Sequence, residues 1–195
     1  MADPVRKADR AYTYSDYQNW SDDERWELID GVAWNMRAAP SRLHQKLSMN
    51  LLMHIGPFLA GKDCEVYHAP FDVLLPDLPG QPEEDVITVV QPDISVICDP
   101  EKLTSKGCTG APDLLVEILS PHTAKKDMDI KFHLYERHGV REYWLIDPGN
   151  RFIHAHLLNN EGKYPEEPAI YLPGSCLASA VLTGLEIELN RIFLP

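Results

Sequence analysis

A short apolar segment with an internal glutamate constrains the fold of this chain more than any other feature. Residues 113–119 read Asp-Leu-Leu-Val-Glu-Ile-Leu, so the segment is apolar except at its two acidic positions. Side chains alternate between the faces of a β-strand, which places Leu115 and Glu117 on one face and Val116 and Ile118 on the other. The run predicts a buried strand, where an ionised carboxylate is costly unless it is paired or bound to a metal. Glu117 therefore needs either a buried Arg or Lys partner or a cation.

The rest of the chain predicts helices and strands on both sides of this segment. Asp30-Gly31 between the apolar runs 26–29 and 32–36 is typical of a β-hairpin, because this pair tolerates positive φ angles. Leucine and isoleucine recur every four residues over 41–59, which indicates a helix that Gly56-Pro57 kinks or ends. The other expected elements are strands at 65–68, 71–75, 87–90, 93–98, 141–146 and 151–158, and a helix over 123–138 that Gly139 ends. This order favours an α/β or α+β fold, with a mixed central β-sheet flanked by helices and an N-terminal β-hairpin.

Length and charge limit the classes of protein to be considered. A chain of 195 residues fits a single domain, expected at 12–195 behind a flexible N-terminal tail at 1–11. Its 30 acidic and 18 basic residues give a formal charge of -12, which repels phosphates at long range and opposes tight, nonspecific DNA binding by a lone subunit. There is no apolar run that could span a bilayer and no signal peptide, so a cytoplasmic protein without a membrane partner is expected. The four cysteines form no C-x-x-C pair and are expected to be reduced thiols.

A second carboxylate and a lysine complete a candidate site around Glu117. Asp93 heads the apolar strand expected at 93–98, and its carboxylate converges with that of Glu117 if the two strands are neighbours. Carboxylate oxygens suit Mg²⁺ or Mn²⁺, and such an ion polarises a phosphate and lowers the pKa of a bound water. Lys131 shares a helix face with Asp127 and Tyr135 at four-residue spacing. From that helix it can reach the site to orient or deprotonate the water, or to stabilise charge on the phosphate.

The combined pattern resembles the PD-(D/E)XK nuclease superfamily and, more closely, its restriction-endonuclease-like family Uma-two. The resemblance covers roughly residues 12–165 and is carried by Glu27-Leu28-Ile29-Asp30-Gly31, Ser41, His44, Pro92-Asp93, the segment from Pro112 to Pro121, Thr123, Asp127, Lys131, Tyr135, and the segment from Gly139 to Pro148. The superfamily lysine normally follows the acid by two residues, where this chain has Leu119. The resemblance implies that Lys131, on the next helix, has taken its place.

The resemblance implies a restriction-endonuclease-like core and an endonuclease that hydrolyses DNA phosphodiester bonds with Mg²⁺ or Mn²⁺. Asp93 and Glu117 are its implied metal ligands, with Lys131 as a further catalytic residue and Glu27 and His44 as accessory ones. No organic cofactor is implied. Superfamily enzymes often cut both strands by pairing subunits, which implies a homodimer.

Simpler explanations of the same residues stay open. Lys131 alone would be a solvated helix lysine, His44 a capping or packing residue, and Glu27 a cross-strand partner. Lys125 and Lys126 are expected as surface charges, which can also touch a phosphate. His154 and His156 share a strand face, but without further ligands they are weak zinc candidates. One alternative function is a catalytically weak or inactive nuclease-fold module acting in binding or regulation, suggested by the charge of -12. Another is a metal-dependent hydrolase of a small phosphorylated substrate.

Overall fold

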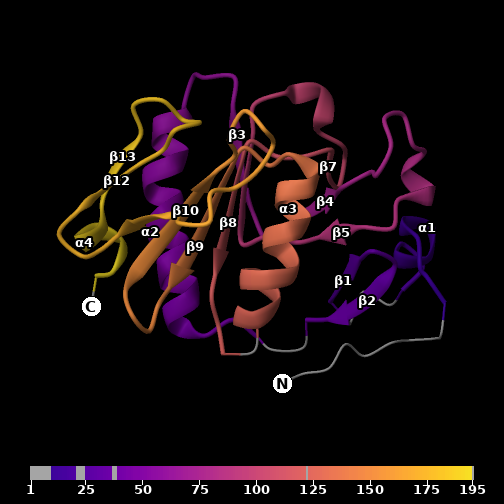
Figure 1. Cartoon of the computed structure of the whole chain (residues 1–195), viewed down its shortest axis with the longest axis horizontal. Coiled ribbons are helices and arrows are strands. Elements are labelled where there is room, and N and C mark those ends of the chain that lie inside the picture. The colour runs from indigo at the N-terminus through magenta and orange to yellow at the C-terminus, as the bar shows by residue number, and fades with distance from the viewer. Residues whose placement is uncertain (1–9, 21–24, 37–38, 122, 195) are drawn as a thin grey trace.

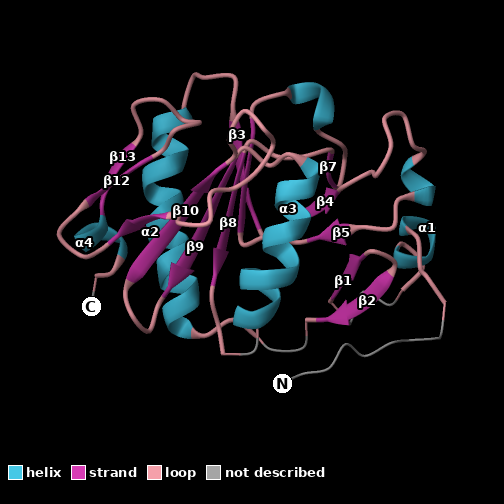
Figure 2. Ribbon diagram, viewed as in Figure 1, coloured by secondary structure: helices cyan, strands magenta, loops and turns pink. Residues whose placement is uncertain are grey.

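A six-stranded mixed sheet with helices on both sides is the centre of the computed structural model, which describes residues 10–20, 25–36, 39–121 and 123–194 (Figures 1 and 2). Its strands lie in the order β11 (Ala169–Tyr171), β10 (Phe152–Leu157), β9 (Glu142–Asp147), β8 (Leu114–Ile118), β6 (Ile94–Ile97) and β3 (Glu65–His68). Strands β8 and β9 are parallel, and the other neighbouring pairs are antiparallel. The predicted mixed α+β architecture is confirmed.

A second, five-stranded sheet carries the predicted N-terminal hairpin. Its strands lie in the order β2 (Val32–Asn35), β1 (Trp26–Ile29), β5 (Val89–Val90), β4 (Asp72–Leu74) and β7 (Gly107–Thr109), and a separate pair joins β12 (Cys176–Ala178) to β13 (Glu186–Glu188). Asp30 and Gly31 have φ angles of 49° and 75°, the positive values that a tight hairpin turn requires at both central positions. The hairpin is therefore confirmed.

The helices are α1 (Tyr14–Tyr17), α2 (Arg42–Leu59), α3 (Phe132–His138) and α4 (Leu189–Ile192), with 3₁₀ turns η1 (Glu83–Asp85) and η2 (Pro100–Lys102) and the π-helical turn η3 (Lys126–Lys131). The side chain of Ser41 caps α2 by accepting a hydrogen bond from the backbone N–H of His44. Gly56-Pro57 does not end this helix, because α2 continues to Leu59. Proline removes only one backbone donor there, and the buried Leu59 keeps the last turn packed on the sheet.

The helix after β8 is not uniform. Residues 126–131 form a π-helical turn before α3 begins, where an ordinary α-helix was expected. The hydroxyl of Tyr143 on β9 donates a hydrogen bond to the backbone oxygen of Asp127 in this turn, at 3.1 Å. Gly139 ends α3 with a φ of 82°, as predicted.

Strand β8 separates two hydrophobic cores, as its alternating sequence predicts. Leu114, Val116 and Ile118 pack in the core that contains the buried face of α2. Leu115 packs on the opposite side with Tyr135 of α3. The face of β8 that carries Glu117 is therefore the face covered by η3 and α3 (Figure 1).

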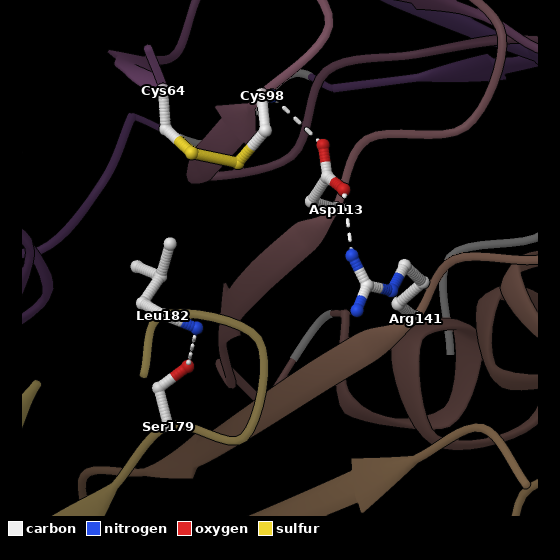
Figure 3. The surroundings of a disulfide bond; sticks show 6 residues. All are labelled: Cys64, Cys98, Asp113, Arg141, Ser179 and Leu182. Carbon is white, nitrogen blue, oxygen red and sulfur yellow. Dashed lines mark hydrogen bonds and ion pairs between the residues drawn. A yellow bond between two sulfur atoms is a disulfide. The ribbon is translucent and has the colours of Figure 1, made fainter. Parts of the chain in front are cut away.

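Two of the four cysteines form a disulfide bond, so the expectation that all are reduced is wrong. Strands β3 and β6 pair with Glu65 opposite Ile97, and the same register sets Cys64 opposite Cys98 at a Cα–Cα distance of 3.8 Å (Figure 3). The carboxylate of Asp113 accepts a hydrogen bond from the backbone N–H of Cys98. The two other cysteines, one buried and one exposed, are free. The expected cytoplasmic location rested in part on reduced thiols, so the disulfide removes that support. The location stays a prediction.

Among the described residues, none of the helices is long and apolar enough to cross a membrane.

Candidate active site

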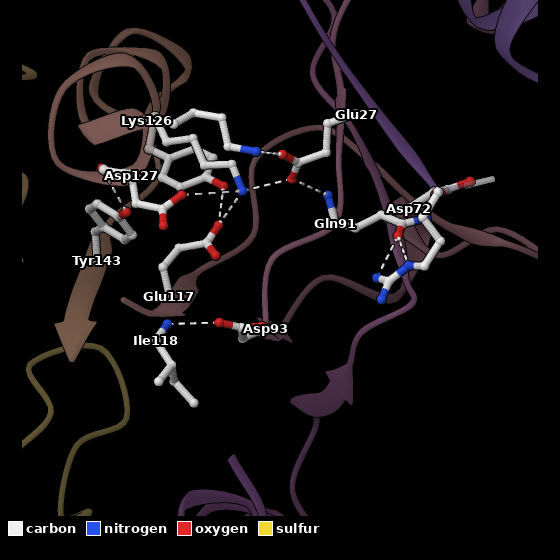
Figure 4. Close-up of polar contacts among 12 residues, drawn as sticks. Glu27, Asp72, Gln91, Asp93, Glu117, Ile118, Lys126, Asp127 and Tyr143 are labelled. Atoms are coloured by element: carbon white, nitrogen blue, oxygen red, sulfur yellow. Dashed lines mark hydrogen bonds and ion pairs between the residues drawn. The ribbon is translucent and has the colours of Figure 1, made fainter. Parts of the chain in front are cut away.

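The buried glutamate of β8 has a lysine partner. Glu117 is 5% exposed, and its Oε1 atom accepts hydrogen bonds from Lys131 Nζ at 2.7 Å and from the Tyr135 hydroxyl at 2.8 Å (Figure 4). Both donors lie on the helical segment that covers this face of the sheet, four residues apart. Burial raises the pKa of Glu117 to about 8, although Lys131 opposes this effect. The carboxyl group is thus held in place, and Lys131 alone does not offset the cost of burying its ionised form.

Glu27 joins the same cluster from the other sheet. Its side chain on β1 is fully buried; Oε1 lies 2.6 Å from Lys131 Nζ and Oε2 lies 2.5 Å from Lys126 Nζ. Oε1 also accepts a hydrogen bond from the backbone N–H of Gln91 at 3.0 Å. Burial acts to raise the pKa of Glu27, but the two ammonium groups outweigh it and lower that pKa to about 2. Glu27 is therefore ionised and holds both lysines.

Lys131 is the centre of the cluster. Its side chain is 2% exposed, and besides Glu27 and Glu117 it has Asp127 Oδ1 at 3.8 Å. Burial lowers the pKa of Lys131, but the surrounding carboxylates dominate and raise it well above the ordinary value. Deprotonation of a water by Lys131, one of the roles considered above, is therefore disfavoured. A fixed positive charge that orients Glu117 is the role that its surroundings support.

Acidic side chains outnumber lysines in this buried network. Three carboxylates, those of Glu27, Glu117 and Asp127, surround two ammonium groups, those of Lys126 and Lys131. Asp127 Oδ1 is buried and has no hydrogen-bond partner among the described residues. Burial raises the pKa of Asp127 as well. An additional cation near these groups would favour their ionised forms and so lower the raised pKa values.

Asp93 and His44 form a second polar pair beside Glu117. Asp93 directly precedes β6, and because Ile94 pairs with Val116, the antiparallel register sets Asp93 opposite Glu117. Asp93 Oδ2 accepts a hydrogen bond from the backbone N–H of Ile118 at 2.7 Å, and His44 Nε2 lies 3.0 Å from the same oxygen. Figure 4 places Glu117 between Asp93 on one side and Lys126 and Asp127 on the other.

Sequence reasoning found most of this constellation and missed one member. The structure gathers Glu27, Glu117 and Lys131 into one cluster and sets Asp93 and His44 beside it. Lys126 was expected as a surface charge that could also touch phosphate, but it is only 12% exposed and paired with Glu27. No periodic signal identifies it, since residues five apart on an α-helix are separated by roughly 140° around the axis. The π-helical turn brings both lysines to one carboxylate.

The histidine pair on β10 does not belong to this site. The rings of His154 and His156 are 6.3 Å apart, and His156 packs against the rings of Phe132 and Tyr164. Burial lowers the pKa of His156 to about 4, which keeps it neutral. The packing is that of a core aromatic residue.

The carboxylates fit a cation that needs few protein ligands. Within the described ranges, no group of three or more His, Cys, Asp and Glu side chains is arranged to hold one metal ion. Asp93 and Glu117 nevertheless remain a suitable pair, because Mg²⁺ keeps several waters and is often bound by one or two carboxylates plus substrate phosphates. Asp127 Oδ1, which has no hydrogen-bond partner among the described residues, and the surplus of acidic side chains nearby also fit a divalent cation.

Comparisons with known proteins bear on the family and the fold of this chain. A family model described as "Uma2: Putative restriction endonuclease" matches residues 14–190. An uncharacterized protein of Synechocystis sp., slr1290, is 28% identical over 152 residues, which cover 76% of this chain and 75% of that protein. A crystal structure from Anabaena variabilis, described as a putative nuclease belonging to DUF820, has a TM-score of 0.70 at 17% identity, covering 91% of this chain and 94% of that one. At this identity the last likeness supports the fold alone.

Proposed function

This chain belongs to the Uma2 family, and from that premise we propose that it is a Mg²⁺- or Mn²⁺-dependent endonuclease that hydrolyses DNA phosphodiester bonds. The observation that supports this function most is the buried Glu117 beside Asp93, in a network whose carboxylates outnumber its ammonium groups. A cluster built only for stability would be expected to match each acidic side chain with a lysine, because an ionised carboxylate without enough compensating charge is costly to bury.

Each residue of the site has a distinct proposed task. Asp93 and Glu117 would hold the metal, which when bound would polarise a phosphate and activate a water. Lys131 and Tyr135 fix the Glu117 carboxylate through hydrogen bonds to Oε1, which leaves Oε2 as its second oxygen for a ligand. His44 fixes Asp93 in the same manner at the start of α2. We also propose a homodimer, since a two-fold interface would gather basic side chains that a monomer of charge -12 lacks.

We expect the wild-type protein to nick or linearise supercoiled DNA in Mg²⁺ or Mn²⁺ and to be inactive in EDTA. The reason is that the proposed cation, held by Asp93 and Glu117, would activate the water, and EDTA removes that cation. The measurement is plasmid conversion on agarose gels over time, with Asp93→Asn as the matched variant, which keeps the shape of the side chain. Cleavage that is equally fast in EDTA, or in the Asp93→Asn variant, would contradict the assignment.

A binding or regulatory module is the second candidate function. It is supported by the formal charge of -12 and by the ion pairs that already engage both lysines of the cluster. A well-folded wild type that cuts neither double- nor single-stranded DNA in either metal would favour this candidate. Cleavage of model phosphodiesters without cleavage of DNA would instead favour a small phosphorylated substrate.

A further inference from the structure

Two lysines of the cluster share one glutamate but differ in what else they contact. Lys131 Nζ is engaged by Glu27 Oε1 at 2.6 Å and Glu117 Oε1 at 2.7 Å, with Asp127 Oδ1 farther away at 3.8 Å. An ammonium group has three donors, so two of the three on Lys131 are used and the third faces another carboxylate. Lys131 has little capacity left for a substrate.

Lys126 has the opposite character. Among the described residues, Glu27 Oε2 is the acceptor recorded for its Nζ atom, which leaves two donors of the ammonium group for another anion. Its side chain is 12% exposed, against 2% for Lys131 and 0% for Glu27. The side chains of Asp93 and His44 are similarly accessible, with exposed fractions of 19% and 16%. The buried part of the cluster thus consists of Glu27, Glu117, Asp127 and Lys131, and the positive charge nearest to solvent is that of Lys126.

The π-helical turn accounts for this division. It places Lys126 and Lys131, five residues apart, on the same side of the helical segment, where each binds a different oxygen of Glu27. π-turns occur mostly as single turns inside helices, frequently at functional sites. Lys125, one residue earlier, is exposed and forms no recorded ion pair with a described residue. The turn therefore places Lys126 in the site and leaves the adjacent Lys125 at the surface.

We propose that Lys126 is the residue of this site that contacts the substrate phosphate, while Glu27 acts as a positioning residue that aims it. This inference rests on the proposed nuclease function. The Lys126 ammonium group can donate one hydrogen bond to Glu27 and another to a phosphodiester oxygen at the same time. Ammonium groups bind phosphate in this way because they are compact charges with rotatable donors. Glu27 retains Lys131, so the buried network stays paired when a phosphate arrives.

The test compares Lys126→Met with Lys125→Met, adjacent variants that change the net charge equally. DNA binding is measured by fluorescence anisotropy with a labelled duplex, in a Glu117→Gln background that blocks cleavage, over a range of salt concentrations. The logarithm of the DNA-binding constant falls linearly with the logarithm of the salt concentration. Loss of one phosphate contact makes this negative slope shallower by about 0.9. We expect that change for Lys126→Met only, together with a roughly 10²-fold loss of cleavage rate in the otherwise wild-type protein. Lys126→Arg should restore most of both, because it keeps the positive charge. The change in salt slope is the readout that a purely structural role of Lys126 would not produce.

Each outcome decides a specific claim. If the wild type cuts DNA but Lys126→Met matches Lys125→Met in slope and rate, the inference on Lys126 is overturned and the nuclease function stands. If the wild type neither binds nor cuts DNA, the nuclease function falls and the inference falls with it. If thermal melting shows that Lys126→Met is unfolded, Lys126→Gln replaces it, because its amide can still hydrogen-bond to Glu27.

Discussion

Replacement of Lys131 by methionine is expected to lower the free energy of unfolding by about 3–5 kcal/mol at neutral pH, the usual cost of breaking a buried ion pair by removing one partner. Lys131 is nearly inaccessible to solvent and faces three carboxylates. Glu27 would keep Lys126, but Glu117 and Asp127 would lose their closest cation. Urea denaturation followed by circular dichroism measures the effect.

The pH dependence of this loss has a defined sign. The pKa of Lys131 is raised in the folded state, so its stabilising contribution is fully present below the ordinary lysine pKa and is lost only as the pH rises through the higher folded value. In the variant, the unpaired carboxylates can take up protons as the pH falls, so the deficit should shrink in acid. Adding Glu117→Gln to Lys131→Met should recover part of the stability, because it removes one uncompensated carboxylate. Strictly additive effects of the two substitutions would contradict a direct coupling.

Glu117→Gln is expected to reduce metal-dependent DNA cleavage by at least about 10³-fold, equivalent to roughly 4 kcal/mol of transition-state stabilisation at 1.36 kcal/mol per tenfold. The amide keeps the shape of the side chain and can still accept hydrogen bonds from Lys131 and Tyr135. It lacks the charge that a hard cation requires. Single-turnover cleavage of a labelled duplex measures the loss. Activity within tenfold of the wild type would exclude Glu117 as a metal ligand.

The pH dependence of the stability of Glu117→Gln provides a control for its folding. Burial raises the pKa of Glu117 to about 8, above its ordinary value of 4.5. The contribution of this group to stability is therefore fully present below pH 4.5 and is lost as the pH rises through 8. Without added metal, Glu117→Gln should gain stability relative to the wild type over that interval. A variant that is inactive and also less stable at every pH would indicate a damaged fold rather than a lost ligand.

Local patterns predicted the parts of this structure that depend on neighbouring residues. The alternation over 113–119 identified the two faces of β8, and Gly139 marked the end of α3. Asp30-Gly31 identified the hairpin for a similar reason, since few residue pairs tolerate positive φ at both positions. These signals are contained in a few consecutive residues.

Features that depend on long-range register were not predictable in this way. The disulfide follows from the pairing of β3 with β6, which sets Cys64 opposite Cys98 across 34 residues of sequence. The place of Glu27 in the cluster depends on β1 reaching η3 from a different sheet. The position of Lys126 beside Glu27 depends on a π-helical turn, for which the sequence contains no recognisable signal. The candidate site was thus predictable as a set of acids with one lysine, but not as a network in which two lysines share one glutamate.

The central claim is that Asp93 and Glu117 bind one divalent cation beside this network. Titration of the protein with Mn²⁺, followed by the electron paramagnetic resonance signal of free Mn²⁺, tests it without reference to catalysis. One Mn²⁺ is expected per wild-type chain, with an affinity at least about tenfold weaker in Asp93→Asn and in Glu117→Gln, since even outer-shell changes typically cost 10–100-fold. Unchanged Mn²⁺ binding in both variants, or no binding by the wild type, would contradict the account.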